Sequence, residues 1–442
     1  MDTMDKRSKI TASVIGSGKT GLLTACLLAE TGYKTLIVDS DHVLASLVKK
    51  GKSASSSLEL AKLMKKHTKS GGLTLANNVR EAASKSAVVI IAHSPLVDEK
   101  RKPDYTHLER ASKEIGAGLQ SGSLVLVEGI VGPGVTETLV KESLQKTSGL
   151  KAGIDFSLAV CPISTTSEAF RNAAASTRLV GALDERSLAA ACLFLKSLAK
   201  SQITTVKNIR TAEAIGIFGS VNEDVNHALS LELARFCEKA GVDFTECQKA
   251  TSANLPFSLP VSNVAKKYFS PEPYLFLEEA ENSGSLLSLV TLARKINEDM
   301  LKRTVHMTKE ALKSCGKMFR RARITVLGIT EHLDPEVLDT HFSRNLVASL
   351  IKNGARVRVY DPLFSVKEIA ELGFQVEATL GKAIEGADCL LIAVGHERFR
   401  RLNLKRIRFL MKQPAALVDV SNVVDSERAV KEGFVYRGLG RG

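Results

Sequence analysis

The sequence predicts an α/β protein with two parallel-sheet domains separated by a helical segment. Three observations support this fold class. Apolar strand-like runs alternate with amphipathic helical stretches at both ends of the chain, the region between them is helical alone, and a glycine-rich turn follows the first run. We expect domains at residues 1–205, 206–318 and 319–442.

The first domain is predicted from apolar runs that are bounded by helical stretches. The runs read TASVIGS, KTLIVDS, AVVIIAHS, SLVLVEGI, DFSLAVC and TRLVGA. The first helical stretch, TGLLTACLLAETG, is expected to end at Gly32 as a C-cap. A last helix, ERSLAAACLFLKSLAK, extends the domain to about residue 205.

The middle domain is predicted from helical periodicity between Thr211 and Lys313. TAEAIGIFGSVNEDVNHALSLELARFCEKAG keeps apolar positions at helical spacing for about thirty residues, too long for a surface crossover helix. A loop rich in proline and serine, Ser252–Pro273, precedes more helix through SLLSLVTLARKINEDMLKRTVHMTKEAL. Long helices of this kind favour a dimer interface, so we expect a homodimer.

The last domain is predicted from a second alternation of strands and helices. Its strand-like runs are ITVLGIT, ARVRVYDP, DCLLIAVG and AALVDVS. The basic stretch from His396 to Lys412 lies within it and interleaves arginines with Phe399, Leu402 and Ile407, which predicts an amphipathic surface helix. A solvated face is favoured over a nucleic-acid site, because the chain has no tryptophan and only 5% aromatic residues.

Composition narrows the remaining classes. The chain has 442 residues, a formal net charge of +13 and seven scattered cysteines without a CxxC pair. This cysteine usage is typical of reduced thiols in the cytoplasm and provides neither a disulfide framework nor a metal site. No apolar run approaches the roughly 18 residues of a membrane span. The positive charge attracts anions such as phosphorylated metabolites.

The turn after the first strand, GSGKTG, fits one of two phosphate-binding patterns. A triphosphate loop requires a glycine five residues before Gly18, and Ser13 occupies that position. The dinucleotide pattern G-x-G-x-x-G fits as Gly16, Gly18 and Gly21, between a strand and a helix. Such a loop places a pyrophosphate on the helix N-terminus, which predicts a Rossmann domain.

The cofactor predicted for this loop is NAD. Asp39 ends the second strand-like run, where an acid accepts hydrogen bonds from ribose hydroxyls, and no arginine adjoins it to bind a 2′-phosphate. Lys19 in the first helical turn is a possible phosphate contact. The candidate cofactor-binding residues are Gly16, Ser17, Gly18, Lys19, Thr20, Gly21, Asp39 and Ser94.

Over nearly its whole length the chain resembles the nucleotide-sugar 6-dehydrogenases, a family that includes UDP-glucose, GDP-mannose and UDP-N-acetylmannosamine dehydrogenases. The resemblance rests on AHSP, VEGIVGPGVTE, SGLKAGIDFSLAVCP, TAEAIGIFGSVNEDVNHALSLELA, VRVYDP, AVGHERF, ALVDVSN and GFVYRGLGRG. It is strongest toward the UDP-N-acetylmannosamine branch.

That resemblance implies an NAD-binding first domain, a dimerising middle domain and a last domain that binds the nucleotide part of a sugar nucleotide for polysaccharide biosynthesis. It also implies a four-electron oxidation of an alcohol to a carboxylate, which requires a cysteine for a thioester and a lysine with an asparagine for oxyanion charge. Other residues occupy the family's catalytic positions here: Ile130, Ile163, Gly216, Ser220, Tyr268 and Glu272.

The resemblance leaves the catalytic residues of this chain unassigned. One interpretation is an NAD-dependent oxidoreductase with altered chemistry, such as a single two-electron oxidation, for which His93, Glu223, His227, Lys266 and Lys267 are conceivable replacement groups. The plainer interpretations are exposed loop charges for the two lysines, a helix-face residue for His227 and a strand-end polar group for His93. The alternative is a catalytically inactive NAD- or nucleotide-binding homologue that regulates or partners an active dehydrogenase. A third hypothesis is a basic nucleic-acid-binding protein on a reused fold.

Overall fold

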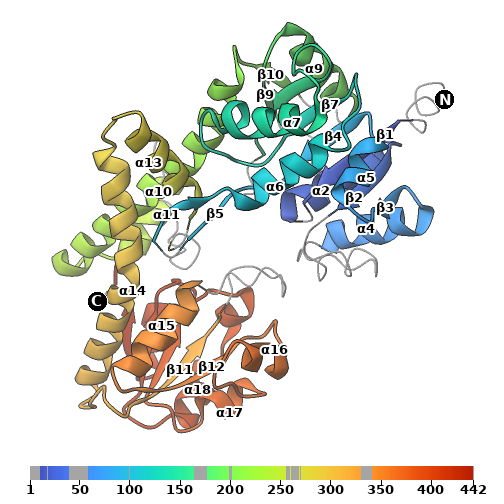
Figure 1. Ribbon diagram of the computed structural model, residues 1–442. Coiled ribbons are helices and arrows are strands. Elements are labelled where there is room, and N and C mark those ends of the chain that lie inside the picture. The colour runs from blue at the N-terminus through green and yellow to red at the C-terminus, as the bar shows by residue number, and fades with distance from the viewer. Residues whose placement is uncertain are drawn as a thin grey trace. The chain divides into compact units, whose positions relative to one another are not determined.

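The computed structural model describes residues 10–16, 18–38, 58–98, 100–163, 177–198, 202–254, 259, 268, 270–329 and 341–441 (Figure 1). The chain divides into two compact units. The first contains Met1–Val221 and Pro271–Leu286, and the second contains Asn222–Ser270 and Leu287–Gly442. The predicted boundaries after residues 205 and 318 stay predictions.

The first unit is built on an eight-stranded sheet with the strand order β10-β9-β8-β7-β4-β1-β2-β3. Its strands pair in parallel, apart from the antiparallel pair β8 and β9. Strand β1 pairs with β2 on one side and with β4 on the other, so the strand order reverses between β1 and β4. The strands are β1 (Thr11–Ile15), β2 (Lys34–Val38), β3 (Leu73–Leu75), β4 (Val88–Ile91), β7 (Leu124–Val127), β8 (Ser157–Val160), β9 (Arg178–Ala182) and β10 (Ile203–Thr205).

Helices cover both faces of this sheet, because its strands are apolar on both sides. Val14 joins the buried cluster beneath α2 (Lys19–Glu30), α4 (Leu58–Ser70) and α9 (Glu185–Leu198). Its neighbour Ile15 joins the opposite cluster, beneath α5 (Val79–Ser84), α6 (Thr106–Gly116) and α7 (Lys141–Ser148). A π-helix, η1 (Thr136–Val140), leads into α7, and β5 (Leu96–Val97) and β6 (Pro103–Asp104) form a small hairpin.

The six predicted strands of this unit are confirmed. The first predicted helix is also present, but it ends at Glu30 with Thr31 as its C-cap, and Gly32, whose φ is +93°, follows that cap. The strands β3 and β10 were not predicted. Both are three residues long, and each carries two exposed residues, so neither leaves an apolar run in the sequence.

The predicted middle helices are also confirmed. They are α10 (Ile209–Ala240) and α14 (Ser288–Ser314), and between them lie two shorter helices that the sequence did not mark separately, α11 (Phe244–Asn254) and α13 (Glu272–Asn282). The predicted loop Ser252–Pro273 is shorter at both ends, because α11 continues to Asn254 and α13 begins at Glu272.

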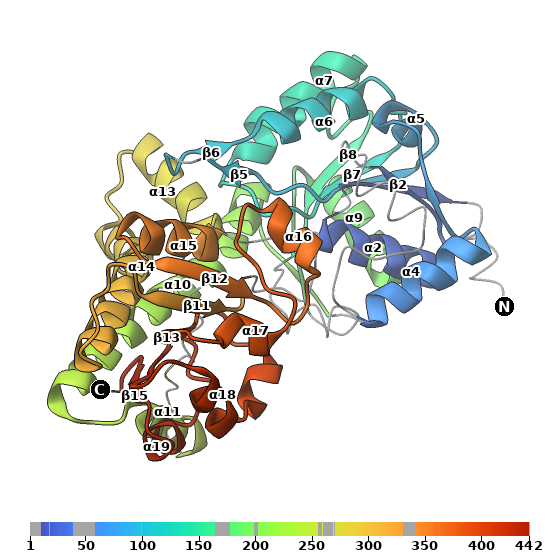
Figure 2. The same cartoon turned by 90° about the horizontal axis from the view of Figure 1, so that it is seen from below.

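The second unit contains a five-stranded parallel sheet with the order β12-β11-β13-β14-β15. The strands are β11 (Arg323–Leu327), β12 (Arg356–Tyr360), β13 (Cys389–Ile392), β14 (Ala416–Asp419) and β15 (Val435–Gly438). Figure 2 shows β12, β11 and β13 between α15 (His341–Lys352) and α18 (Leu404–Leu410). The first four strands were predicted, whereas β15 was not, because its residues are only partly apolar.

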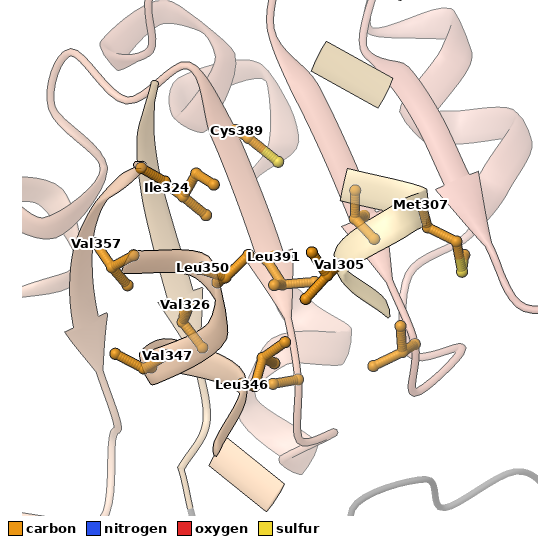
Figure 3. Close-up of a cluster of buried hydrophobic side chains, with 14 of the residues drawn as sticks. Val305, Met307, Ile324, Val326, Leu346, Val347, Leu350, Val357, Cys389 and Leu391 are labelled. Atoms are coloured by element: carbon orange, nitrogen blue, oxygen red, sulfur yellow. The ribbon is translucent and has the colours of Figure 1, made fainter. Parts of the chain in front are cut away.

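The core of the second unit lies between this sheet and α14 and α15. Figure 3 shows Val305 of α14 beside Leu391 of the sheet, and Leu346 of α15 on the side of Val326. Met307 of α14 belongs to the same buried cluster. The opposite face packs on α17 (Leu380–Ile384), α18 and α19 (Ser426–Lys431), and α16 (Val366–Glu371) follows β12.

The prediction of one amphipathic helix from His396 to Lys412 is wrong. This stretch forms a 3-10 helix, η2 (Glu397–Arg401), an extended residue at Leu402, and then α18. Asn403 interrupts the helix because its side chain accepts a hydrogen bond from Arg406 N and caps a new helical start. Phe399 and Ile407 are buried. The stretch is therefore amphipathic, but as two short helices.

None of the helices in the described ranges is long and apolar enough to cross a membrane. All seven cysteines are free thiols.

Candidate functional site

The glycine loop connects β1 to α2, and each of its three glycines has a distinct steric reason. Gly16 has a φ of +110°, which favours a residue without a side chain. A Cβ on Gly21 would lie 1.8 Å from the Gly16 carbonyl oxygen, so only glycine allows this close approach of helix to turn. A Cβ on Gly18 would meet nothing within 4 Å, which leaves that backbone open to a ligand. The geometry of the loop suits a bound pyrophosphate.

The N-terminus of α2 adjoins this open backbone. Gly18 is the N-cap and supplies no side-chain hydrogen bond, and the first turn contains no acidic residue. The first N–H groups of a helix have no partners within the helix and attract anions. Thr20 is buried in this turn. Ser17, Asp39 and the side chain of Lys19 lie outside the described residues.

The loop lies where the strand order of the first sheet reverses, between β1 and β4. In open α/β sheets, ligands bind in this crevice at the carboxyl ends of the strands. His93 follows β4, and its ring atoms lie 3.4 Å from the position of a Cβ on Gly16. The half-buried His93 imidazole is therefore an ionisable group beside the glycine loop.

Ser94 joins the loops that follow β4 and β7. Its Oγ accepts a hydrogen bond of 3.1 Å from Ile130 N. A Cβ on Gly129 would lie 1.8 Å from the His93 carbonyl oxygen, so these two loops touch through backbone. The Ile130 side chain is buried and apolar. Ser94 thus supports the crevice wall, and Ile130 provides no proton donor or acceptor through its side chain.

Glu128, which the sequence did not identify as a candidate, is a buried carboxyl immediately after β7. Thr24 Oγ1 of α2 donates a hydrogen bond to its Oε2. Burial raises the pKa of Glu128, and the nearby Arg178 guanidinium opposes the rise. Ile163, beyond the neighbouring strand, donates its N–H to the Glu128 carbonyl at 3.1 Å. An acid at the end of an apolar strand was the signal that could have marked this residue.

Gly216 stands on α10 where the resemblance implies a lysine. A Cβ at this position would lie 2.7 Å from Cβ of Pro162, which follows β8. A lysine therefore could not enter without displacing a proline at the end of a central strand. Ser220 lies one turn further along α10 and is half-buried. In the first unit, the position expected to stabilise an oxyanion carries no side chain.

Glu213, one turn before Gly216 on α10, forms hydrogen bonds that the sequence did not predict. Its buried carboxylate accepts hydrogen bonds from the backbone N–H groups of Gly134 and Thr136, at the start of η1. Burial raises the pKa of Glu213 to about 7, against the lowering effect of these hydrogen bonds. The contact fixes α10 to the loop that follows β7.

Tyr268, at the position where the resemblance implies the cysteine nucleophile, is a core residue of the second unit. Its ring packs edge-to-face on Phe342 with centroids 5.4 Å apart. Its hydroxyl accepts a hydrogen bond of 3.2 Å from Asn345 Nδ2. Only 8% of the residue is exposed. Its surroundings are those of a packing residue.

A buried polar network holds α10 and α14 of the second unit together. Arg294 pairs with Asp224, and its guanidinium also donates to the Tyr268 carbonyl at 2.8 Å. Nδ1 of the buried His227 lies 2.9 Å from Asn297 Oδ1. The plainer interpretation of His227, as a helix-face residue, fits this position. Lys266 and Lys267 lie outside the described residues, and Glu223 is exposed on α10.

Glu272, at the position where the resemblance implies an aspartate, begins α13 in the first unit. A carboxylate in the first turn of a helix is favoured by the helix dipole, so its position has a structural explanation.

Buried cysteines of this chain are poor nucleophiles, because burial raises the pKa of their thiols. Cys161, beside Pro162, is completely buried. Burial raises the pKa of its thiol to about 12, and the nearby Glu128 adds to the rise. Burial likewise raises the pKa of Cys26 to about 12. Because the thiolate is the reactive form, these two thiols are inert at neutral pH.

The second sheet has its own strand-order reversal, between β11 and β13. At this edge Asp361, directly after β12, accepts hydrogen bonds from Ile329 N at 2.9 Å and lies 3.0 Å from His396 Nε2. Asp419 ends β14 and accepts from Val423 N, and burial raises the pKa of Asp419 to about 6. This buried acidic edge is the candidate nucleotide site of the second unit.

Comparison with known proteins agrees with this architecture. Residues 10–197 match the NAD-binding domain of the UDP-glucose/GDP-mannose dehydrogenase family, and residues 340–426 match the UDP-binding domain of that family. A UDP-N-acetyl-D-mannosamine dehydrogenase of Pyrococcus horikoshii is 28% identical over 97% of this chain and 99% of that protein. The UDP-glucose 6-dehydrogenase of Bacillus subtilis is 25% identical over 97% of this chain and 93% of its own length.

The fold is likewise that of solved dehydrogenases. The structure of a UDP-D-ManNAc dehydrogenase from Pyrococcus horikoshii superimposes with a TM-score of 0.85 and 26% identity, covering 98% of this chain and all of that one.

Proposed function

The chain belongs to the UDP-glucose/GDP-mannose dehydrogenase family, whose members are NAD-dependent, and we propose that it binds NAD and a nucleotide sugar without performing the four-electron oxidation. The observation that carries this proposal is steric. Pro162 occupies the space that a side chain at Gly216 would need.

Support for NAD binding comes from the glycine loop. Gly18 exposes its backbone at the start of α2, and Gly16 and Gly21 allow the turn and the helix to approach closely. We propose that the N–H groups of this turn, with Ser17, Lys19 and Thr20, hold the pyrophosphate, that Asp39 holds the adenosine ribose, and that Ser94 supports the crevice wall. NAD, when bound, supplies a hydride acceptor.

The second oxidation step is the one that this chain lacks the groups to perform. Conversion of an aldehyde to a carboxylate through a thioester requires a thiolate nucleophile. The family resemblance assigns Tyr268 to the position of that nucleophile, and its side chain is packed into a core. Cys161 has a buried thiol whose pKa is raised to about 12. Loss of one oxyanion-stabilising group alone typically costs about 10²–10³ in rate, and here the nucleophile is absent as well.

A single two-electron alcohol oxidation needs only a base near the hydride acceptor. His93 favours this activity, because its imidazole lies beside Gly16 at the crevice of the first sheet. In this scheme His93 takes the proton of the sugar hydroxyl, and the hydrogen on the carbon that bears this hydroxyl leaves as a hydride to the acceptor. The product is an aldehyde or ketone, with no thioester stage.

The test is NAD reduction with a panel of UDP- and GDP-sugars, with products identified by mass spectrometry. We expect one NADH per sugar and a carbonyl product in the wild type, and loss of turnover with retained NAD affinity in His93→Gln. Two NADH per sugar with a carboxylate product would refute the proposal.

The alternative is a catalytically inactive homologue that regulates or partners an active dehydrogenase. The apolar side chains of Ile130 and Ile163, together with the bare Gly216, favour it. Calorimetric NAD binding without turnover on any sugar, combined with co-purification of an active dehydrogenase, would select this alternative. Failure to bind NAD would exclude both versions.

We also propose a homodimer formed through the middle helices of the second unit. Four apolar side chains on these helices are at least half exposed. Leu229 and Phe236 are seven residues apart on α10, and Leu289 and Leu292 are three residues apart on α14. Apolar residues at this spacing form a stripe on one helix face, which a second copy would cover. Sedimentation should show a dimer, and Phe236→Glu should shift it to monomer. Arg406→Gln, which changes the charge by the same amount on exposed α18, is the control. The cytoplasmic location stays a prediction.

A further inference from the structure

A small cavity lies at the amino ends of β11 and β12, at the edge of the second sheet opposite to its candidate nucleotide site. Its volume is about 180 Å³, and three arginines line it, namely Arg323, Arg356 and Arg358. Rossmann-type domains bind nucleotides at the carboxyl ends of their strands, so this cavity is separate from that edge.

The strand register brings the three guanidinium groups to one face of the sheet. Arg323 is directly opposite Arg356, and Thr325 is opposite Arg358, in the parallel pair β11 and β12. Neighbouring strands are about 4.8 Å apart, so two like charges face each other at the sheet edge. Both side chains are exposed, so water screens much of their repulsion, and a bound anion would remove the remainder.

The side chains around the cavity compensate this charge only in part. Arg358 Nε lies 3.8 Å from a Glu377 carboxylate oxygen, and its NH1 donates to the Lys382 carbonyl at 3.2 Å. Glu385 also lines the cavity. Within the described part of the chain, Arg323 and Arg356 form no ion pair. The cavity therefore keeps an excess of positive charge.

A larger cavity in the same unit provides a contrast. It has a volume of about 700 Å³ beside α10, α19 and β15. There Asp243 pairs with Arg441 at 3.1 Å, and Glu238 pairs with Arg303. The described side chains that line the larger cavity include three acids and three bases, so its charge is balanced, namely Glu238, Asp243, Glu427, Lys431, Arg437 and Arg441. Among the described residues, three arginines and one acid, Glu385, line the smaller cavity.

We propose that the cavity formed by Arg323, Arg356 and Arg358 binds the phosphate or pyrophosphate group of a small, soluble phosphorylated compound. Guanidinium groups present paired N–H donors that match phosphate oxygens, and such charge-assisted hydrogen bonds are strong. A volume of about 180 Å³ is below the roughly 300–1,000 Å³ of ordinary ligand pockets, so it suits phosphoryl groups and not a whole nucleotide.

Calorimetric titration of the full-length protein with inorganic pyrophosphate tests this site. NAD and UDP are left out, because their own diphosphate groups would compete for the arginine cavity. The arginine variants separate binding in this cavity from binding at the glycine loop and the carboxyl edge of the second sheet. Arg323→Gln and Arg356→Gln should each weaken pyrophosphate binding about tenfold or more. Arg406→Gln, which removes the same charge from exposed α18, should change it by less than about twofold.

Three outcomes would overturn the proposal: no pyrophosphate binding by the wild type, unchanged binding in both arginine variants, or an equal loss in Arg406→Gln, which would indicate diffuse attraction to a basic protein. Arg323→Lys keeps the charge but loses the paired donors and should give an intermediate affinity. That conservative variant keeps the test informative if Arg323→Gln fails to fold. NAD affinity, measured separately, should be equal in all variants.

Discussion

Replacement of Gly21 by alanine separates the packing role of the glycine loop from its contact with the cofactor. An alanine Cβ would lie 1.8 Å from the Gly16 carbonyl oxygen, and both groups belong to the main chain, so no side chain can turn away. Overpacking of this kind costs about 1–3 kcal/mol, and a backbone–backbone clash falls at the upper end. For a unit of this size each kcal/mol lowers Tm by about 2–4 °C, so we expect a loss of about 6–12 °C.

The assay combines thermal unfolding followed by circular dichroism with calorimetric NAD binding. Gly21→Ala should lower both Tm and NAD affinity. Gly18→Ala, where a Cβ meets nothing within 4 Å, should retain Tm but weaken NAD binding, because the methyl group enters the open side of the loop. Gly219→Ala, in the open interior of α10, should be up to about 1 kcal/mol more stable. If Gly21→Ala kept the wild-type Tm and NAD affinity, the assigned loop geometry would be wrong.

Three further predictions concern positions away from the loop. Burial raises the pKa of Glu213 to about 7, so between about pH 4.5 and pH 7 the folded state holds a proton that the unfolded state has lost. The free energy of unfolding should therefore fall by about 3 kcal/mol as the pH rises across this range. Urea unfolding measures this slope, and Glu213→Gln should flatten it. Gly216→Lys should lower Tm without adding turnover, whereas Gly219→Lys, at a position with open space, should leave Tm nearly unchanged. A gain of carboxylate product in Gly216→Lys would contradict the steric argument. Tyr268→Cys should lower the free energy of unfolding by about 3 kcal/mol, because it leaves a cavity, and should yield no oxidation. Tyr268→Phe should lower it by only about 1 kcal/mol, because it loses only the hydrogen bond from Asn345. Urea unfolding measures both values.

The elements that the sequence predicted well are those with a strong periodic signal. The central strands are continuous apolar runs because helices cover both sheet faces, and α10 keeps helical spacing over its 32 residues. The misses have local causes. The strands β3, β10 and β15 are short or only partly apolar, and Asn403 divides the basic stretch into two helices through its cap.

The candidate site likewise has features that the sequence predicted and features that it did not. The glycine spacing and its position between a strand and a helix are local properties, so they predicted a dinucleotide loop. The buried carboxyls of Glu128 and Glu213 were missed, because their burial and their partners come from segments far away in the chain.

The sequence alone therefore determined the fold class and the dinucleotide loop, since each depends on identity and spacing along the chain. The exchange of residues at the catalytic positions stays a prediction from the family resemblance. Only the tertiary structure decided that Pro162 closes the space beside Gly216, that Tyr268 is a core residue, and that Arg323 and Arg356 face each other across two strands. These facts depend on distances between residues that are remote in sequence, and sheet register and helix packing set those distances.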